Sequence, residues 1–90
     1  MDFEWNPAKD EANLRKHGIS FVDAATVFSD PLSYTFDDPD HAQHEHRWLT
    51  LGRTQSGRLL IVSHTERNRR IRIISAREAT KYERKIYEEG

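Results

Sequence analysis

The stretch of residues 61–77, IVSHTERNRRIRIISAR, decides the fold, because hydrophobic and charged side chains alternate along it. Alternation with a period of two residues is typical of strands that bury one face, so the stretch predicts an antiparallel β-hairpin. We expect the turn of this hairpin at residues 66–69. The final helix is predicted to follow the second strand directly, beginning at Ser75 or Ala76 and ending near Glu89.

The predicted hairpin also carries an unusual density of positive charge. Four arginines fall within six positions, preceded by one histidine and followed by a fifth arginine: Arg67, Arg69, Arg70 and Arg72, with His64 before and Arg77 after. Strand alternation divides the second strand into two faces: Ile71, Ile73 and Ser75 on one, and Arg70, Arg72 and Ile74 on the other. Since neighbouring cations repel one another, we expect an anion opposite them, either a phosphate backbone or an acidic protein partner.

The rest of the chain predicts an α+β domain. A helix at 7–17 has Asn6 as its N-cap and Gly18 as its stop, and a shorter helix follows Ser20. Further strands are expected at 3–5, 33–36, 47–53 and 58–65, the last being the most hydrophobic and therefore central in the sheet. The predicted order is β-α-α-β-β-β-β-α. The helices then pack on a small, mostly antiparallel sheet within one domain over residues 1–90.

Composition narrows the class of protein. The chain has 90 residues and no cysteine, which excludes disulfides and thiolate metal sites. No basic and hydrophobic leader follows Met1, so we expect a cytoplasmic protein without a signal peptide. Residues 1–45 hold three Lys or Arg against ten Asp or Glu, whereas residues 46–90 hold eleven against five. This asymmetry indicates either contact with nucleic acid or mutual neutralisation of the two halves.

Cleavage of RNA is a chemistry that these residue types permit. The 2′-hydroxyl of RNA is an internal nucleophile, so the protein needs only proton-transfer groups and cations around the phosphate. Arginine matches phosphate oxygens, and histidine exchanges protons near neutrality. The candidate catalytic residues are His17, Arg47, His64, Arg72 and Arg77. The candidate RNA-binding residues are Lys16, Arg53, Arg67, Arg69 and Arg70.

A loop rich in histidine raises the question of a metal. Its candidate ligands are Asp38, Asp40, His41, His44 and His46. Their spacing fits no standard zinc pattern, so we interpret them as solvated loop side chains and expect neither metal nor cofactor. We expect Trp5, Trp48 and Tyr82 to belong to the core.

Several motifs, in order, resemble one known family. They are FEWNPAK (3–9), NLRKHGISF (13–21), AATVFSDP (24–31), RWLTLGR (47–53), LIVSHT (60–65), IRIISAR (71–77) and ERKIY (83–87). Together they cover nearly the whole chain, and they are similar to the BrnT toxins of bacterial type II toxin–antitoxin modules. One departure is His46, where relatives often have an acid before the arginine of the second strand.

The resemblance implies a RelE-like fold and a ribonuclease that inhibits translation. It also implies a cognate antitoxin with a ribbon-helix-helix part, a heterotetramer of two toxins and two antitoxins, and promoter binding only through the antitoxin. We therefore predict a metal-independent endoribonuclease. The alternative is a non-catalytic module whose basic face docks an acidic antitoxin in an autorepressor complex, because an acidic peptide and RNA require the same kind of surface.

Overall fold

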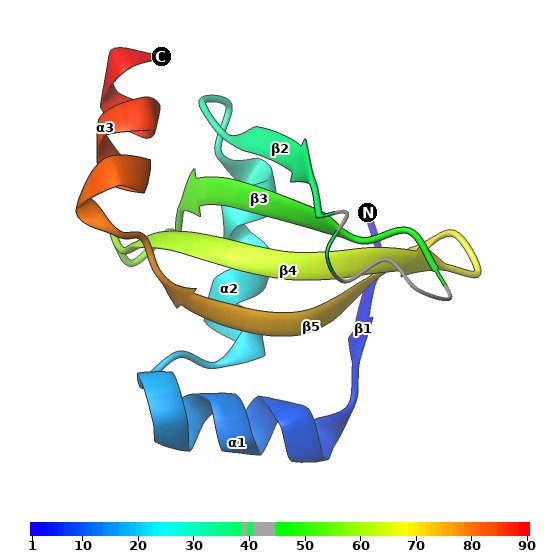
Figure 1. Ribbon diagram of the computed structural model, residues 1–90. Helices are drawn as coiled ribbons and strands as arrows, with labels where there is room; N and C mark the ends of the chain where they lie inside the picture. The colour runs from blue at the N-terminus through cyan, green and yellow to red at the C-terminus, as the bar shows by residue number, and fades with distance from the viewer. Residues whose placement is uncertain (39, 41–44) are drawn as a thin grey trace.

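Five strands form one sheet, with helices on both of its faces (Figure 1). The computed structural model describes residues 1–38, 40 and 45–90. Its elements are β1 (Phe3–Trp5), α1 (Pro7–His17), α2 (Phe21–Ala25), the 3₁₀ helix η1 (Thr26–Ser29), β2 (Tyr34–Asp37), β3 (Trp48–Arg53), β4 (Leu59–Arg67), β5 (Arg70–Glu78) and α3 (Lys81–Glu89). The strand order is β1-β5-β4-β3-β2, and only the β1–β5 pair is parallel. The α+β class and the central position of β4 are confirmed.

The ends of α1 form as the capping residues predict. The Asn6 side chain accepts hydrogen bonds from the backbone N–H groups of Ala8 (2.8 Å) and Lys9 (3.3 Å). At the other end, Gly18 has φ 69°, and its N–H donates to the Leu14 carbonyl at 2.9 Å. A glycine adopts this left-handed conformation without the steric cost of a Cβ, so the helix ends directly after His17.

The predicted start of the final helix is wrong. Strand β5 continues to Glu78, and α3 begins at Lys81 after Thr80. A capping box sets this start: the Thr80 hydroxyl accepts from the Glu83 N–H (3.1 Å), and the Glu83 carboxylate accepts from the Thr80 N–H (2.8 Å). Two of the four free N–H groups at the helix start are thereby satisfied. Tyr82, expected in the core, is instead 74% exposed.

The hairpin turn is shorter than predicted. Only Asn68 and Arg69 lie between the strands, with φ values of 54° and 63°, and Arg67 pairs with Arg70 across the turn. Two successive residues with positive φ match the right-handed twist of the flanking strands, so a two-residue loop suffices. The strands β4 and β5 therefore extend further toward the tip than the composition of residues 66–69 indicates.

A bulge changes the predicted faces of β5. Ser63 pairs with Ser75 and His64 pairs with Ile73, which leaves Ile74 without a partner on β4. An extra residue shifts the phase of the alternation by one. Ile73 and Ala76 consequently lie in the same buried cluster, whereas Ser75, predicted to share the face of Ile71 and Ile73, faces the opposite side with Arg77.

Each face of the sheet has its own hydrophobic cluster. The first joins α2 and η1 to the sheet and includes Phe21, Val27, Leu60 and Val62, with Trp5 packed against it. The second lies under α3 and is built on Leu51, Leu59 and Ile61, with Ile86 and Tyr87 packed against it. No residue of α3 is fully buried, so this helix rests on the sheet through one side only.

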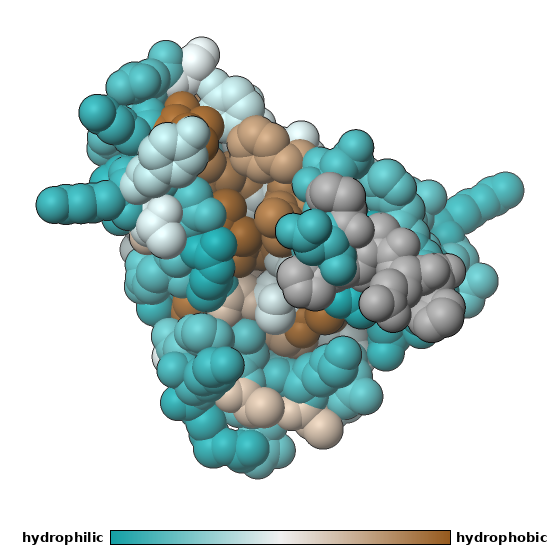
Figure 2. All heavy atoms as spheres, in the orientation of Figure 1, coloured by the Kyte–Doolittle hydropathy of each residue, from teal (hydrophilic) through white to brown (hydrophobic). Residues whose placement is uncertain are grey.

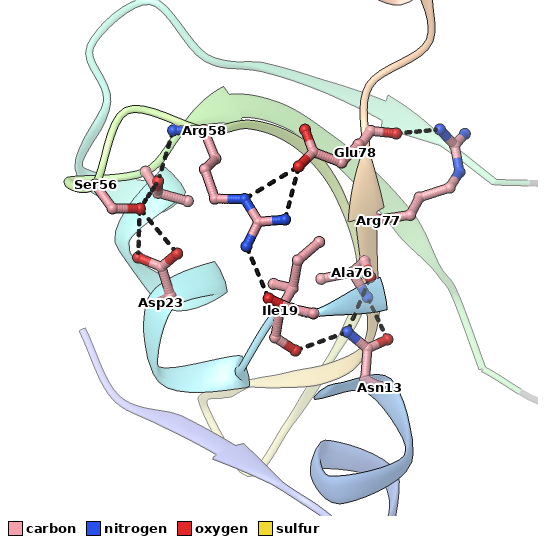
Figure 3. Close-up of polar contacts among 10 residues, drawn as sticks. Asn13, Ile19, Asp23, Ser56, Arg58, Ala76, Arg77 and Glu78 are labelled. Carbon is pink, nitrogen blue, oxygen red and sulfur yellow. Dashed lines mark hydrogen bonds and ion pairs between the residues drawn. The ribbon is translucent and has the colours of Figure 1, made fainter. Parts of the chain in front are cut away.

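Asn13 ties α1 to the sheet through three buried hydrogen bonds (Figure 3). Its amide nitrogen donates to the carbonyls of Ile19 (3.0 Å) and Ala76 (2.9 Å), and its amide oxygen accepts from the Ala76 N–H (3.1 Å). The side chain therefore replaces a strand neighbour for the backbone of Ala76. This contact fixes the end of α1, which carries His17, beside the part of β5 that carries Arg77.

We expect Asn13→Ala to lower the free energy of unfolding by about 2 kcal/mol. The substitution leaves buried backbone groups of Ile19 and Ala76 without partners, a loss that the better helix propensity of alanine offsets only in part. Urea unfolding followed by circular dichroism measures the change. Leu14→Ala is the matched control, because Leu14 lies next to Asn13 but is 51% exposed. Equal stabilities of the two variants would contradict the role given to Asn13.

Among the described residues, no helix has the length and hydrophobicity needed to cross a membrane.

Candidate functional site

A hollow of about 300 Å³ opens on the face of the sheet that carries α3. Leu49, Ile61 and Ile74 are part of its lining. Its polar lining consists of His17, Asp38, Arg47, Ser63, Ser75 and Arg77. Figure 2 shows hydrophobic side chains gathered on this side between α3 and β2, surrounded by hydrophilic ones.

Three separate parts of the chain bring His17 and two arginines to this hollow. His17 is the last residue of α1, Arg47 directly precedes β3, and Arg77 lies on β5. The backbone holds Arg47 in place, because its carbonyl accepts from the Asp38 N–H at 2.9 Å. The Nε of Arg47 is buried and has no hydrogen-bond partner among the residues that the structure describes. A buried donor without an acceptor is costly, so the position of this side chain is not explained by hydrogen bonds within the described part of the chain.

Arg77 is held by a carboxylate. Its Nη1 and Nη2 donate to the two oxygens of Glu83 at 2.8 and 2.9 Å. Its Nη1 also donates to the Glu78 carbonyl at 3.1 Å, a bond that Figure 3 shows. The hydrogen bonds to Glu83 raise the pKa of Arg77. The hydrogen bonds from Arg77 in turn lower the pKa of Glu83 to about 2. Both groups are therefore charged at neutral pH.

His64 lies on the other face of the sheet. The residue is 7% exposed, and its ring is in contact with Phe28 (centroids 4.8 Å apart) and Trp48 (6.0 Å). Its Nε2 shares a hydrogen bond of 2.7 Å with the Thr50 hydroxyl. Burial lowers the pKa of His64 to about 4, so the ring is neutral at neutral pH. The structure thus does not bring His64 together with His17, Arg47 and Arg77.

Acids from the first half of the chain pair with two arginines of the hairpin. Arg72 meets Glu4 at 2.6 Å, since β1 runs beside β5, and Arg67 meets Glu45 at 3.2 Å. The two halves of the chain thus partly neutralise each other, as one of the two interpretations of the charge asymmetry requires. Arg72 does not line the hollow.

The other candidate RNA-binding residues are spread over the surface. Arg53 donates to the Gly57 carbonyl at 2.9 Å and lies over the Tyr87 ring, 5.5 Å from its centroid. Lys16 is exposed at the end of α1, and Arg69 and Arg70 are exposed at the hairpin tip. The structure places none of these four side chains in the hollow.

The histidine-rich loop is described only in part. His41 and His44 lie outside the described residues. His46 bonds Asp37 at 2.8 Å and packs against the Trp48 ring. Within residues 1–38, 40 and 45–90, no three His, Asp or Glu side chains are arranged to hold a metal ion.

Sequence reasoning missed Glu83, Ser63 and Ser75. Thr80 and Glu83 have the sequence spacing of a capping box, which is a signal for a helix start. With the helix starting there, Arg77 lies before the helix and belongs to the strand. No such signal exists for Ser75, because the face of the sheet on which its side chain lies depends on the bulge opposite residues 63 and 64.

Comparisons with known proteins agree with this fold. A family model described as "Ribonuclease toxin, BrnT, of type II toxin-antitoxin system" matches residues 5–83. Among solved structures, the chain is similar to the ribonuclease toxin BrnT of Brucella abortus, with a TM-score of 0.69 and 21% sequence identity over 90% of this chain and 99% of that chain. At this identity the likeness concerns the fold. No curated protein matches the sequence.

Proposed function

Because the chain belongs to the BrnT family of ribonuclease toxins of type II toxin–antitoxin systems, we propose that it is a metal-independent endoribonuclease that cuts RNA in the hollow described above. One observation carries the choice of site: His17 at the end of α1, Arg47 just before β3 and Arg77 on β5 line the same hollow. A proton-transfer group and two cations are what cleavage through the 2′-hydroxyl requires.

Each residue has a role in the proposed reaction. The 2′-oxygen attacks phosphorus and loses its proton while the bond to the 5′-oxygen breaks, giving a 2′,3′-cyclic phosphate and, once the leaving oxygen gains a proton, a 5′-hydroxyl. Arg47 and Arg77 bind the non-bridging oxygens, whose negative charge increases in the transition state. His17 carries one of the two proton transfers. His64 is not assigned to this step, because its ring is buried on the opposite face.

A type II toxin has a cognate antitoxin, and we propose a control mechanism for this one. The antitoxin carries a ribbon-helix-helix part, covers the basic hollow and forms a heterotetramer of two toxins and two antitoxins that binds promoter DNA through the antitoxin alone. Free toxin would then inhibit translation by cutting RNA. A neighbouring reading frame for a short ribbon-helix-helix protein would support this arrangement, as would suppression of cleavage by its product.

The protein without antitoxin is expected to cleave RNA with 5 mM EDTA present as fast as without it. The substrate supplies the nucleophile and arginines supply the positive charge, so no metal is needed. Gel analysis of an end-labelled RNA measures the rate. The control is the same oligonucleotide with 2′-deoxy sugars, which should stay intact because it lacks the nucleophile.

Two outcomes would contradict the proposal in different ways. Cleavage that EDTA abolishes and Mg²⁺ or Mn²⁺ restores would contradict metal independence. A folded protein that cuts neither free nor ribosome-bound RNA would favour the non-catalytic module, in which the same basic surface only binds the acidic antitoxin.

A further inference from the structure

Glu83 has two structural roles at once. Its Oε1 accepts from the Thr80 N–H at 2.8 Å, which starts α3, and its two oxygens accept from Arg77 at 2.8 and 2.9 Å. The Glu83 side chain is 21% exposed, compared with 42% for Arg77. The Glu83 carboxylate is therefore fixed by the start of α3 and mostly shielded from water. It holds the Arg77 guanidinium, which lines the hollow.

The bonds to Glu83 use only one edge of the guanidinium. Arginine has five N–H donors in a fixed plane. Glu83 accepts one hydrogen of Arg77 Nη1 and one hydrogen of Nη2. The Glu78 carbonyl accepts the other hydrogen of Nη1, as Figure 3 shows. The Nε–H and the second hydrogen of Nη2 have no partner in the described part of the chain. These two parallel donors form an edge that matches two oxygens of one phosphate.

Electrostatics also requires a partner for Arg77. Arg47 lines the same hollow, and its guanidinium and that of Arg77 repel each other, although the acidic residue Asp38 also lines the hollow. The carboxylate of Glu83 offsets this repulsion. Hydrogen bonds from Arg77 lower the pKa of Glu83 to about 2, so the pair stays charged throughout the pH range of an RNA cleavage assay.

We propose that Glu83 is a positioning residue of the ribonuclease site, which holds the Arg77 guanidinium along its Nη1–Nη2 edge and leaves the Nε–Nη2 edge to bind the scissile phosphate. This inference rests on the proposed function. Glu83 does not touch the RNA; it restricts the rotamers of Arg77 before the substrate arrives. Pre-organisation of this kind lowers the barrier of the chemical step more than it strengthens binding.

Glu83→Gln tests the proposal with little damage to the fold. Glutamine at this position still completes a capping box, but it offers Arg77 a single neutral acceptor in place of a charged fork. We expect an unchanged helical circular dichroism signal, a kcat lowered about tenfold and a KM within about twofold of the wild type. The control is Glu88→Gln, which removes the same charge from an exposed position of α3 and should leave kcat unchanged.

A double-mutant cycle separates positioning from other effects. In an Arg77→Ala background, Glu83→Gln should lower kcat no further, because the group that it positions is absent. An unchanged kcat in the folded Glu83→Gln variant would overturn the inference. A lower KM together with a higher kcat would also overturn it, because Glu83 would then compete with the phosphate for Arg77. If Arg77→Ala itself cleaves like the wild type, the proposed site fails, and the inference fails with it.

Discussion

Replacement of Arg77 by alanine is expected to lower kcat for RNA cleavage by about 10²–10³-fold. The size follows from the loss of one fixed donor group that meets the charge developing on phosphate oxygens in the transition state. Single-turnover cleavage of an end-labelled RNA measures the chemical step. Arg77→Lys keeps the charge but cannot present two parallel donors, so it should recover only part of the rate.

Two controls make the Arg77 result interpretable. Loss of Arg77 leaves the Glu83 carboxylate without its partner, so the stability of the variant must be measured by thermal unfolding before its rate is compared. Arg15→Ala is the matched control, because Arg15 is an exposed arginine of α1 that pairs with Glu11 at 2.7 Å and does not line the hollow. A folded Arg77→Ala variant with the rate of Arg15→Ala would remove the hollow from the mechanism.

The second large expected effect is a loss of folding stability in acid, which His64 causes. Burial lowers the pKa of His64 from 6.5 to about 4. Between these two values, His64 is protonated in the unfolded chain and neutral in the folded chain. The free energy of unfolding therefore does not depend on His64 titration above pH 6.5. It decreases as the pH falls below 6.5, by about 3 kcal/mol at pH 4. Urea unfolding between pH 7 and pH 4 measures this slope.

His64→Gln should flatten the pH dependence that His64 causes. Glutamine keeps a polar group near the Thr50 hydroxyl but does not titrate in this range. His17→Gln serves as the control and should keep the slope, because His64 is still present. Equal slopes in the wild type and His64→Gln would show that the histidine is not buried as a neutral ring in solution.

Local signals in the sequence predicted those elements whose ends are set by nearby residues. Asn6 and Gly18 determine α1 because both act on backbone groups within four residues. The end of β5 was misplaced for a different reason. The prediction carried regular alternation through Ile74 and Ser75 and then began a helix, whereas a bulge shifts the phase there and β5 continues to Glu78.

Residue types alone predicted the candidate chemistry but not its assembly. Arginine and histidine near a strand were enough to indicate phosphate chemistry, and His17, Arg47 and Arg77 do meet in one hollow. Arg72 and His64 carry the same chemical groups, yet Arg72 is paired with Glu4 and His64 is buried on the other face. Their neighbours come from β1, β3 and η1, which are distant in sequence.

The sequence by itself therefore determined the class of the domain, the first helix, the central strand and the residue types of the site. The tertiary structure alone decided which arginines line the hollow. The unpaired Ile74 shifts the phase of β5 and turns Ser75 and Arg77 to the side of α3, and the capping box of α3 then places Glu83 against Arg77. The physical reason is that a side chain's face depends on strand register, and register is set by pairing with another strand rather than by its own residues.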